Sequence, residues 1–462
     1  MKPPRLAARL TRLARPYLAT FFSFSAIQAA QLLLPLLALP WLARVLGAEA
    51  FGLLMYMSVL PPLITLVVDW GFPLGGAREA ATLRGDKAAL SGLLGAVVTA
   101  RLLLALGCGV CGLLLLPVLP HAAAHPWAYG AALLMGVTRG LSPVWFAQGV
   151  GRGMERMAAW DVGSSLCALG LTVLVVRGPE EWPLYLLFTA LCKGLAYGGL
   201  TLGLMRAWGA RPALRHGWAA LRRTRTLFAS SVASTFSVSA GQLVLGYFLS
   251  AADMGLLVAV GKIVRALVKL LNPAIQTLFP ELCARQGHRP ASPGLPGAPG
   301  SPDATARLLR LFLVTAALCM LLAAALAWLL APWLMRLALG PGYAGAVPVL
   351  RLMLPLVPLL GCDMVLGAQV LVPLGLEKQQ NRVQWAAALL SLPLAALFAW
   401  QFGLTGGALL PVAAEALTFA GLWACVARSC PGALIPGKYL PTRSPAAPEK
   451  RFTAAPFSPK QE

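Results

Sequence analysis

The fold class is decided by the stretch ALSGLLGAVVTARLLLALGCGVCGLLLLP, which occupies residues 89–117 and contains one charged residue, Arg101. A helix of about 20 apolar residues is long enough to cross the hydrocarbon core of a bilayer. Because no water is present there, the backbone must satisfy its own hydrogen bonds, and a helix does so within one segment. The stretch therefore predicts a transmembrane helix.

Similar stretches recur along the whole chain. Of its 462 residues, 58% are hydrophobic and 12% are charged, and the mean hydropathy is +0.74. A soluble domain usually carries about 25% charged residues, so this chain has too little polar surface for a water-soluble globule. We predict an all-α integral membrane protein of about twelve transmembrane helices. The predicted spans are 17–40, 52–76, 89–117, 127–149, 158–176, 183–205, 226–249, 254–279, 308–334, 346–373, 382–401 and 404–427.

The distribution of basic residues predicts the orientation of these helices. The net charge is +22, and 28 of the 38 Lys and Arg residues fall in the two terminal segments and in the loops on the same side of the membrane. The opposite loops contain only Arg44, Arg177 and Arg336. Since cytoplasmic loops are enriched in Lys and Arg, we expect both termini in the cytoplasm. This rule explains the basic charge without a nucleic-acid partner, and aromatic residues do not interleave with the basic runs as nucleic-acid binding would require.

A short repeat indicates two halves. LGAEAFGLL (46–54), at the first outer turn, resembles LSAADMGLL (249–257), at the turn between the seventh and eighth predicted spans. Two six-helix halves that enter the membrane in the same direction would be a parallel repeat, with a substrate site between them. The predicted domains are an N-terminal lobe (1–205), a basic cytoplasmic linker (206–225), a C-terminal lobe (226–430) with a flexible cytoplasmic loop (287–306), and a disordered cytoplasmic tail (431–462).

Ionisable residues inside the predicted spans are the candidates for function, because a charge at the centre of a membrane helix costs at least about 2.5 kcal/mol and normally faces a partner or water. Lys262, Arg265 and Lys269 share one helix face at spacings of three and four. Three cations on one stripe repel one another unless they are solvated or bind an anion, and a phosphate or diphosphate suits Arg and Lys. The intramembrane basic residues are Arg101, Arg139, Lys193, Lys262, Arg265, Lys269 and Arg351.

The acidic candidates are fewer, so the basic groups cannot all be neutralised by internal pairing. They are Asp69, Asp161, Asp363 and Glu415. We expect Asp69 to cap a helix or to pair with Arg78, and Asp363 or Glu415 to bind a coupling cation or proton. Asp69, Asp363 and Glu415 are the candidates for coupling or gating.

The sequence contains no catalytic signature. A Walker A loop, GxSxG, HExxH and a catalytic constellation of paired carboxylates on an outer loop are all missing. Cys108 and Cys111 form a CxxC-like pair, but inside an apolar helix, and no histidine joins the cysteines at zinc-ligand spacing. We therefore expect no catalytic residue, metal or cofactor.

Several stretches resemble the polysaccharide-transporter flippases, the Wzx-type O-antigen translocases of the MOP exporter superfamily. They are LPLLALPWLARVLGAEAFGLL (34–54), VDWGFPLGGAREAA (68–81), SPVWFAQGVGRGMERM (142–157), FPELCA (279–284), YAGAVPVLRLMLPLVPL (343–359) and LVPLGLEKQ (371–379). The resemblance implies a MATE-like arrangement of two six-helix lobes around a central cavity in the bacterial inner membrane.

The resemblance also implies a function: translocation of an undecaprenyl-pyrophosphate-linked oligosaccharide by alternating access, coupled to an ion or a proton. Cationic residues would hold the diphosphate, and a polymerase and chain-length machinery would be partners. Substrate-binding candidates are Arg101, Arg139, Lys193, Lys262, Arg265 and Lys269. The alternatives are a drug/cation antiporter, a peptidoglycan-precursor flippase, a membrane polysaccharide polymerase or ligase, and a non-transporting scaffold.

Overall fold

The computed structural model describes residues 5–119, 121–269, 302–371 and 376–429. Every regular element in this part of the chain is a helix, and the residues divide into two compact units, Met1–Thr235 and Phe236–Glu462. The helix α9 contains the point of division. The predicted tail 431–462 and most of the predicted loop 287–306 lie outside the described residues, although Pro302 already begins a helix. The predicted lobe and linker boundaries stay predictions.

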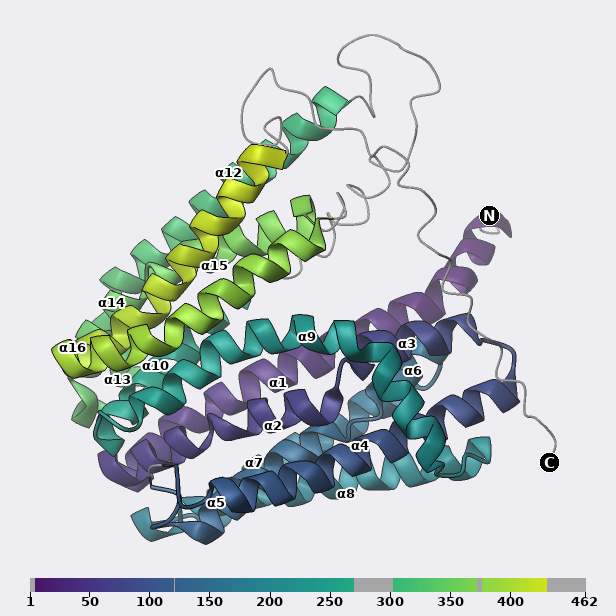
Figure 1. Ribbon diagram of the computed structural model, residues 1–462, viewed down its shortest axis with the longest axis horizontal. Coiled ribbons are helices and arrows are strands. Elements are labelled where there is room, and N and C mark those ends of the chain that lie inside the picture. The colour runs from purple at the N-terminus through teal and green to yellow at the C-terminus, as the bar shows by residue number, and fades with distance from the viewer. Residues whose placement is uncertain (1–4, 120, 270–301, 372–375, 430–462) are drawn as a thin grey trace. The chain divides into compact units, whose positions relative to one another are not determined.

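Unit 1 is a bundle of long helices interrupted by short breaks (Figure 1). Its helices are α1 (Arg5–Met57), α2 (Leu60–Asp69), α3 (Phe72–Thr82), α4 (Lys87–Leu115), α5 (Pro126–Gly140), α6 (Val144–Val150), α7 (Met154–Val175), η1 (Pro179–Glu181), α8 (Pro183–Trp208) and α9 (Leu214–Leu245).

Unit 2 combines long helices with short helical pieces. They are α10 (Ala251–Lys269), α12 (Pro302–Leu329), α13 (Ala331–Ala338), η2 (Pro341–Tyr343), α14 (Ala346–Met353), α15 (Leu356–Val365), the π-helical turn η3 (Leu366–Leu371) and α16 (Glu377–Ser429).

The helices match the predicted membrane spans. Each of the twelve predicted spans falls mainly on helix in the described part of the chain, with 254–279 described only as far as Lys269 and 346–373 only as far as Leu371. Six stretches of the described residues are by themselves long and apolar enough to cross a bilayer, and two of these, Ile27–Thr82 and Lys378–Ser429, contain 56 and 52 residues. About 20 residues suffice for one crossing, so each of the two long stretches can cross twice. Both bend at a glycine with non-helical backbone angles, Gly47 and Gly403.

The two copies of the repeat both mark helix breaks. In the first copy, Gly47 has a φ of 73° and interrupts α1. The equivalent residue of the second copy is Ser250, directly before α10. Its hydroxyl accepts a hydrogen bond from the Asp253 backbone N–H, and it donates to the Asp253 carboxylate. Such a cap satisfies backbone groups that the first helical turn leaves unpaired, so the two copies turn the chain by different local means.

Some of the prolines lie where a helix begins, and others lie inside a helix. Pro61 lies in the first turn of α2, and Pro355 is the N-cap of α15, which divides the predicted span 346–373 into α14 and α15. Proline lacks a backbone N–H and is tolerated in the first turn, where that group would be unsatisfied. A segment predicted as one bent helix is thereby two helices.

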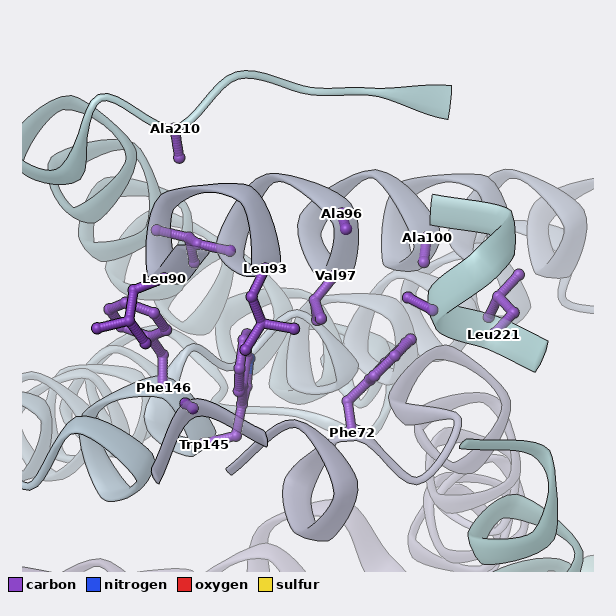
Figure 2. Packing of buried hydrophobic residues seen from close by; sticks show 13 residues of the cluster. Phe72, Leu90, Leu93, Ala96, Val97, Ala100, Trp145, Phe146, Ala210 and Leu221 are labelled. Carbon is purple, nitrogen blue, oxygen red and sulfur yellow. The ribbon is translucent and has the colours of Figure 1, made fainter. Parts of the chain in front are cut away.

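Apolar side chains of α4 form the centre of unit 1. Figure 2 shows Leu90, Leu93 and Val97 of α4 facing Trp145 and Phe146 of α6 and Phe72 of α3. The outer face of α4 exposes Leu106, Leu113 and Leu114 instead. This division is the one expected of a helix that packs on one side and meets lipid on the other.

Candidate functional site

A helix break places Asp69 in the interior of unit 1. Residues Trp70 and Gly71 separate α2 from α3, and both have left-handed backbone angles, with φ of 43° and 77°. The Trp70 indole N–H donates to the Leu221 carbonyl oxygen at 3.0 Å, and its ring stacks on Phe228 at 3.7 Å between centroids. A Cβ at Gly71 would lie 3.0 Å from the Phe228 backbone nitrogen, so glycine is required for the close approach of α9.

Small residues bring α5 against α2. Gly136 and Gly140 are spaced four apart, and a Cβ on either would lie 2.6 Å from the Cβ of Ile64 or Val68 respectively. Glycines at this spacing let two membrane helices pack with their backbones close together. The Thr65 hydroxyl donates to the Gly136 carbonyl oxygen at 2.9 Å. This packing sets the end of α5 beside the end of α2.

Arg101 of α4 joins the two helix breaks. Its Nη2 donates to Asp69 Oδ1 at 2.8 Å, and its Nη1 donates to the Ser142 carbonyl oxygen at 2.6 Å, between α5 and α6. The guanidinium lies 5.7 Å from the Phe72 ring centroid and 5.9 Å from that of Trp145, and Arg101 is 3% exposed. Asp69 therefore pairs with Arg101, and the expected pairing with Arg78 was wrong. Nothing in the sequence order links residues 69, 101 and 142.

A second ion pair lies between α7 and α8. Lys193 Nζ donates to Asp161 Oδ1 at 2.8 Å and to the Asp161 carbonyl oxygen at 2.7 Å, and the Tyr197 hydroxyl donates to the same carboxylate oxygen. Asp161 is 0% exposed and Lys193 is 5% exposed. Tyr197 lies four residues after Lys193, so both side chains come from one face of α8.

Ser142 connects these two ion pairs. Its carbonyl oxygen accepts from Arg101, and its side chain lies close to the Tyr197 hydroxyl. Asp161 Oδ2 has no hydrogen-bond partner in the described part of the protein. Charged and polar groups from α2, α4, α7 and α8 thus form one network inside unit 1. Sequence reasoning noted Asp161 as an acid but left it out of the site, and it missed Tyr197 and Ser142. The one available signal was the spacing of Tyr197 from Lys193.

Arg139 is the intramembrane cation of unit 1 that stays without a carboxylate among the described residues. It lies in the last turn of α5, is partly buried, and is close enough to Lys193 for their charges to repel. The Asp161 carboxylate already neutralises Lys193. A positive charge therefore remains at this end of α5.

The three predicted cations of the eighth span lie in α10. Lys262 and Arg265 are partly buried and Lys269 is exposed. The Arg265 guanidinium lies back along the helix, beside Gly261. A Cβ added to Gly261 would lie 3.2 Å from Arg265 Nη2. Arg265 and Lys269 are close enough to repel each other, and neither forms a salt bridge within the described ranges.

Arg351 of α14 is held by an aromatic ring. Its guanidinium carbon lies 4.4 Å from the centroid of the Trp328 ring on α12. A cation over the face of tryptophan is stabilised by the ring quadrupole. Its Nε has no hydrogen-bond partner in the residues described, and none of the salt bridges found there involves Arg351.

Asp363 and Glu415 lie side by side in unit 2. Their carboxyl groups are close enough to influence each other electrostatically, and Asp363 is 9% exposed. Both Asp363 oxygens lack a hydrogen-bond partner of ordinary geometry among the residues that the structure describes. An ionised carboxylate in that position would be costly, so the pair is suited to hold a proton. The π-helical turn η3, a rare backbone form frequent at functional sites, follows Asp363 closely.

Comparison with known proteins identifies the family. A family model described as "Polysaccharide biosynthesis protein" matches residues 17–284, more than half of the chain. The chain belongs to this family. Its stretches 34–54, 68–81, 142–157 and 279–284, on which the resemblance to polysaccharide transporters rested, lie within the matched region.

Two curated relatives in this family have the same printed name, "Putative O-antigen transporter". The one from Escherichia coli (strain K12) is 26% identical over 406 residues, which cover 85% of this chain and 92% of the relative. The one from Shigella dysenteriae is 23% identical over 388 residues, which cover 82% and 92%. Both are named as transporters rather than enzymes.

Solved structures show that this polysaccharide biosynthesis protein has the MOP-superfamily fold. The lipid II flippase MurJ in an inward closed conformation has a TM-score of 0.65 at 12% identity, covering 89% of this chain and 87% of MurJ. An inward-facing multidrug resistance MATE transporter of the MOP superfamily has a TM-score of 0.67 at 13% identity, covering 88% and 98%. The predicted all-α, MATE-like membrane fold is confirmed.

Proposed function

We propose that this protein translocates a polyprenyl-diphosphate-linked oligosaccharide, such as an O-antigen repeat unit, across the bacterial cytoplasmic membrane by alternating access. The observation that carries the proposal is a set of intramembrane cations without a carboxylate partner in the described part of the chain. They include Arg139, Arg265 and Lys269; Arg351 also lacks a carboxylate partner there but lies over the Trp328 ring. Unpaired cations at membrane depth are expensive and mark substrate pathways.

A diphosphate is the ligand that fits these cations. It carries several negative charges and accepts charge-assisted hydrogen bonds, which are shorter and stronger than neutral ones. The name of the relatives, O-antigen transporter, agrees with a diphosphate-linked glycan as cargo. A transporter of cationic drugs would instead need uncompensated acids, and two of the four intramembrane carboxylates are neutralised by Arg101 and Lys193.

Arg101 and Lys193, which are paired with carboxylates, can bind substrate only under one condition. For Arg101 or Lys193 to bind a substrate phosphate, the phosphate would have to replace Asp69 or Asp161, which would then need a proton. Arg101 also bonds the Ser142 carbonyl oxygen at a helix break, whereas the hydrogen bonds of Lys193 go to the Asp161 carboxylate and carbonyl. Lys193 is therefore the better candidate of the two for substrate binding.

The energy source that we propose is a proton gradient acting on Asp363 and Glu415. Two adjacent carboxyl groups in a low-dielectric site cannot both be ionised without strong repulsion. The pair can therefore gain and lose a proton as its exposure to the two sides of the membrane alternates. Both termini would lie in the cytoplasm, in accordance with the basic loops.

The test uses a strain that lacks the gene and accumulates the lipid-linked oligosaccharide on the cytoplasmic side. Wild-type protein should restore surface glycan, whereas the variant Lys262→Gln/Arg265→Gln/Lys269→Gln should not, although it reaches the membrane in normal amount. A matched variant, Arg206→Gln/Arg215→Gln/Arg225→Gln, removes the same charge from exposed positions and should restore it. Full glycan production by the α10 variant would refute the substrate assignment.

A further inference from the structure

A basic pocket lies within unit 1, away from the intramembrane ion pairs. It has a volume of about 660 Å³ and is formed by α4, α6, α7, α8 and the turns before α4 and α7. Ligand pockets in proteins usually measure about 300–1,000 Å³. Four cations line it, and no carboxylate of the described residues does. The cations are Arg84, Lys87, Arg152 and Arg156.

These cations are available to a ligand. None of the four forms a salt bridge with any carboxylate in the described ranges. Arg84 is fixed in place, because its Nε donates to the Gly149 carbonyl oxygen at 2.7 Å. The neighbouring acid Asp86 is occupied as the N-cap of α4, where it accepts from the Ala89 N–H at 2.9 Å. Glu155 lies beside Arg156 in sequence but does not line the pocket.

The backbone adds donors on the same side. Gly153, which lines the pocket, is the N-cap of α7 and offers no side chain to the first helical turn. The initial N–H groups of this 22-residue helix are consequently left for another acceptor. Helix N-termini favour anions for this reason, so the pocket combines four side-chain charges with an uncapped helix end.

The remaining walls are apolar. Leu90 and Phe146 belong to the core cluster of Figure 2, and Phe146 meets Trp208 edge to face at 5.4 Å between centroids. Leu200 and Leu204 of α8 complete this side. A free phosphate ion would not use such walls, whereas the glycerol and first methylene groups of a lipid would. A tryptophan at this level is also typical of the membrane interface.

We propose that this pocket binds the phosphate headgroup of an anionic glycerophospholipid. The charge distribution predicts that this end of unit 1 faces the cytoplasm, and basic pockets between membrane helices on that side bind acidic headgroups. The pocket is too small for a lipid-linked oligosaccharide, which argues for a resident lipid rather than the cargo. The ligand would hold the ends of α4, α7 and α8 together.

The test measures lipid binding to the purified protein by native mass spectrometry, with phosphatidylglycerol and phosphatidylcholine as probes. Wild-type protein should bind phosphatidylglycerol in preference. The variant Lys87→Gln/Arg152→Gln/Arg156→Gln should bind it on the order of 100-fold more weakly, about fivefold for each lost charge. The variant Arg206→Gln/Arg215→Gln/Arg225→Gln has the same net charge and should bind normally. Equal losses in both variants would show general surface attraction and overturn the proposal.

A second variant fills the pocket without changing charge. Gly203 lines the pocket, and a Cβ at this position would meet no other atom within 4 Å. Gly199, one turn earlier on α8, has equally open space but does not line the pocket. Gly203→Leu should abolish the preference for phosphatidylglycerol and Gly199→Leu should keep it.

The outcomes of these measurements separate the alternatives. Normal binding by Gly203→Leu would refute the pocket as the site. Preferential binding of undecaprenyl diphosphate would assign the pocket to the cargo and overturn the assignment to a resident phospholipid. Both readouts are independent of transport.

Discussion

Arg101 and Asp69 are 32 positions apart in the chain and form a hydrogen-bonded ion pair of 2.8 Å inside unit 1. Lys193 and Asp161 repeat the same separation and the same distance. In both pairs the acid and the base lie on different helices of one unit, so the charges neutralise each other without contributions from the rest of the molecule. The difference lies in the surroundings, because Arg101 also bonds the Ser142 carbonyl at a helix break.

Substitutions of Arg101 and Asp69 should have non-additive effects on the stability of the protein. Arg101→Gln and Asp69→Asn should each destabilise the protein by about 3 kcal/mol, because one buried charge loses its partner. The double variant should lose less than the sum of the two, since no lone charge remains. Thermal unfolding in detergent, followed by size-exclusion chromatography, measures this. Strictly additive losses would contradict the pairing.

The α2–α5 contact should depend on Gly136. In Gly136→Leu, the new Cβ would lie 2.6 Å from the Ile64 Cβ. Such overpacking costs about 1–3 kcal/mol. Gly130 is on the same helix and has no atom within 4 Å of a Cβ position. Gly130→Leu should be neutral or slightly stabilising, because leucine is the better helix former. The measurement is the melting temperature of each variant in detergent. Equal values for the two variants would contradict the close packing of α2 and α5 at Gly136.

The carboxyl pair should determine proton coupling. In proteoliposomes, an imposed pH gradient should accelerate glycolipid translocation by the wild type. Asp363→Asn should fold normally but remove this acceleration, because an amide cannot exchange the proton. Glu180→Gln, at an exposed position in η1, serves as the control and should behave as the wild type. An Asp363→Asn protein that still responds to the gradient would exclude the pair as the coupling site.

Acidic pH should lower the stability of the protein through His121, in the loop between α4 and α5. Burial, together with the charge of His125, lowers the pKa of partly buried His121 below its usual value of 6.5. The unfolded chain then holds more protons at this residue, so stability falls as pH decreases through 6.5 and is recovered above it. His121→Asn should flatten this dependence, and asparagine tolerates the φ of 61° found here.

A matched variant separates the two causes. His125→Asn removes the neighbouring charge and should shrink the acid effect without abolishing it, since burial is the larger cause. Melting temperatures between pH 5 and 8 give the comparison. An unchanged pH profile in His121→Asn would contradict the contribution of this histidine.

The sequence by itself determined the helices, since hydropathy and length are local properties that the membrane reads segment by segment. It also determined that charges such as Arg101 and Lys193 lie at membrane depth, and the family stretches indicated the MOP-type fold. The sequence did not determine the partner of each charge, because the partner depends on which helices pack together. Gly136 and Gly140 allow α5 to approach α2, and this contact brings Ser142 to Arg101.

The tertiary structure alone decided that Asp69 meets Arg101 rather than Arg78, that Tyr197 joins Asp161, and that Asp363 lies beside Glu415. Electrostatic energy falls with distance in space and is indifferent to distance along the chain. A set of charges in the sequence therefore predicts that pairs must form, but only packing determines which ones form and which cations are left for a ligand.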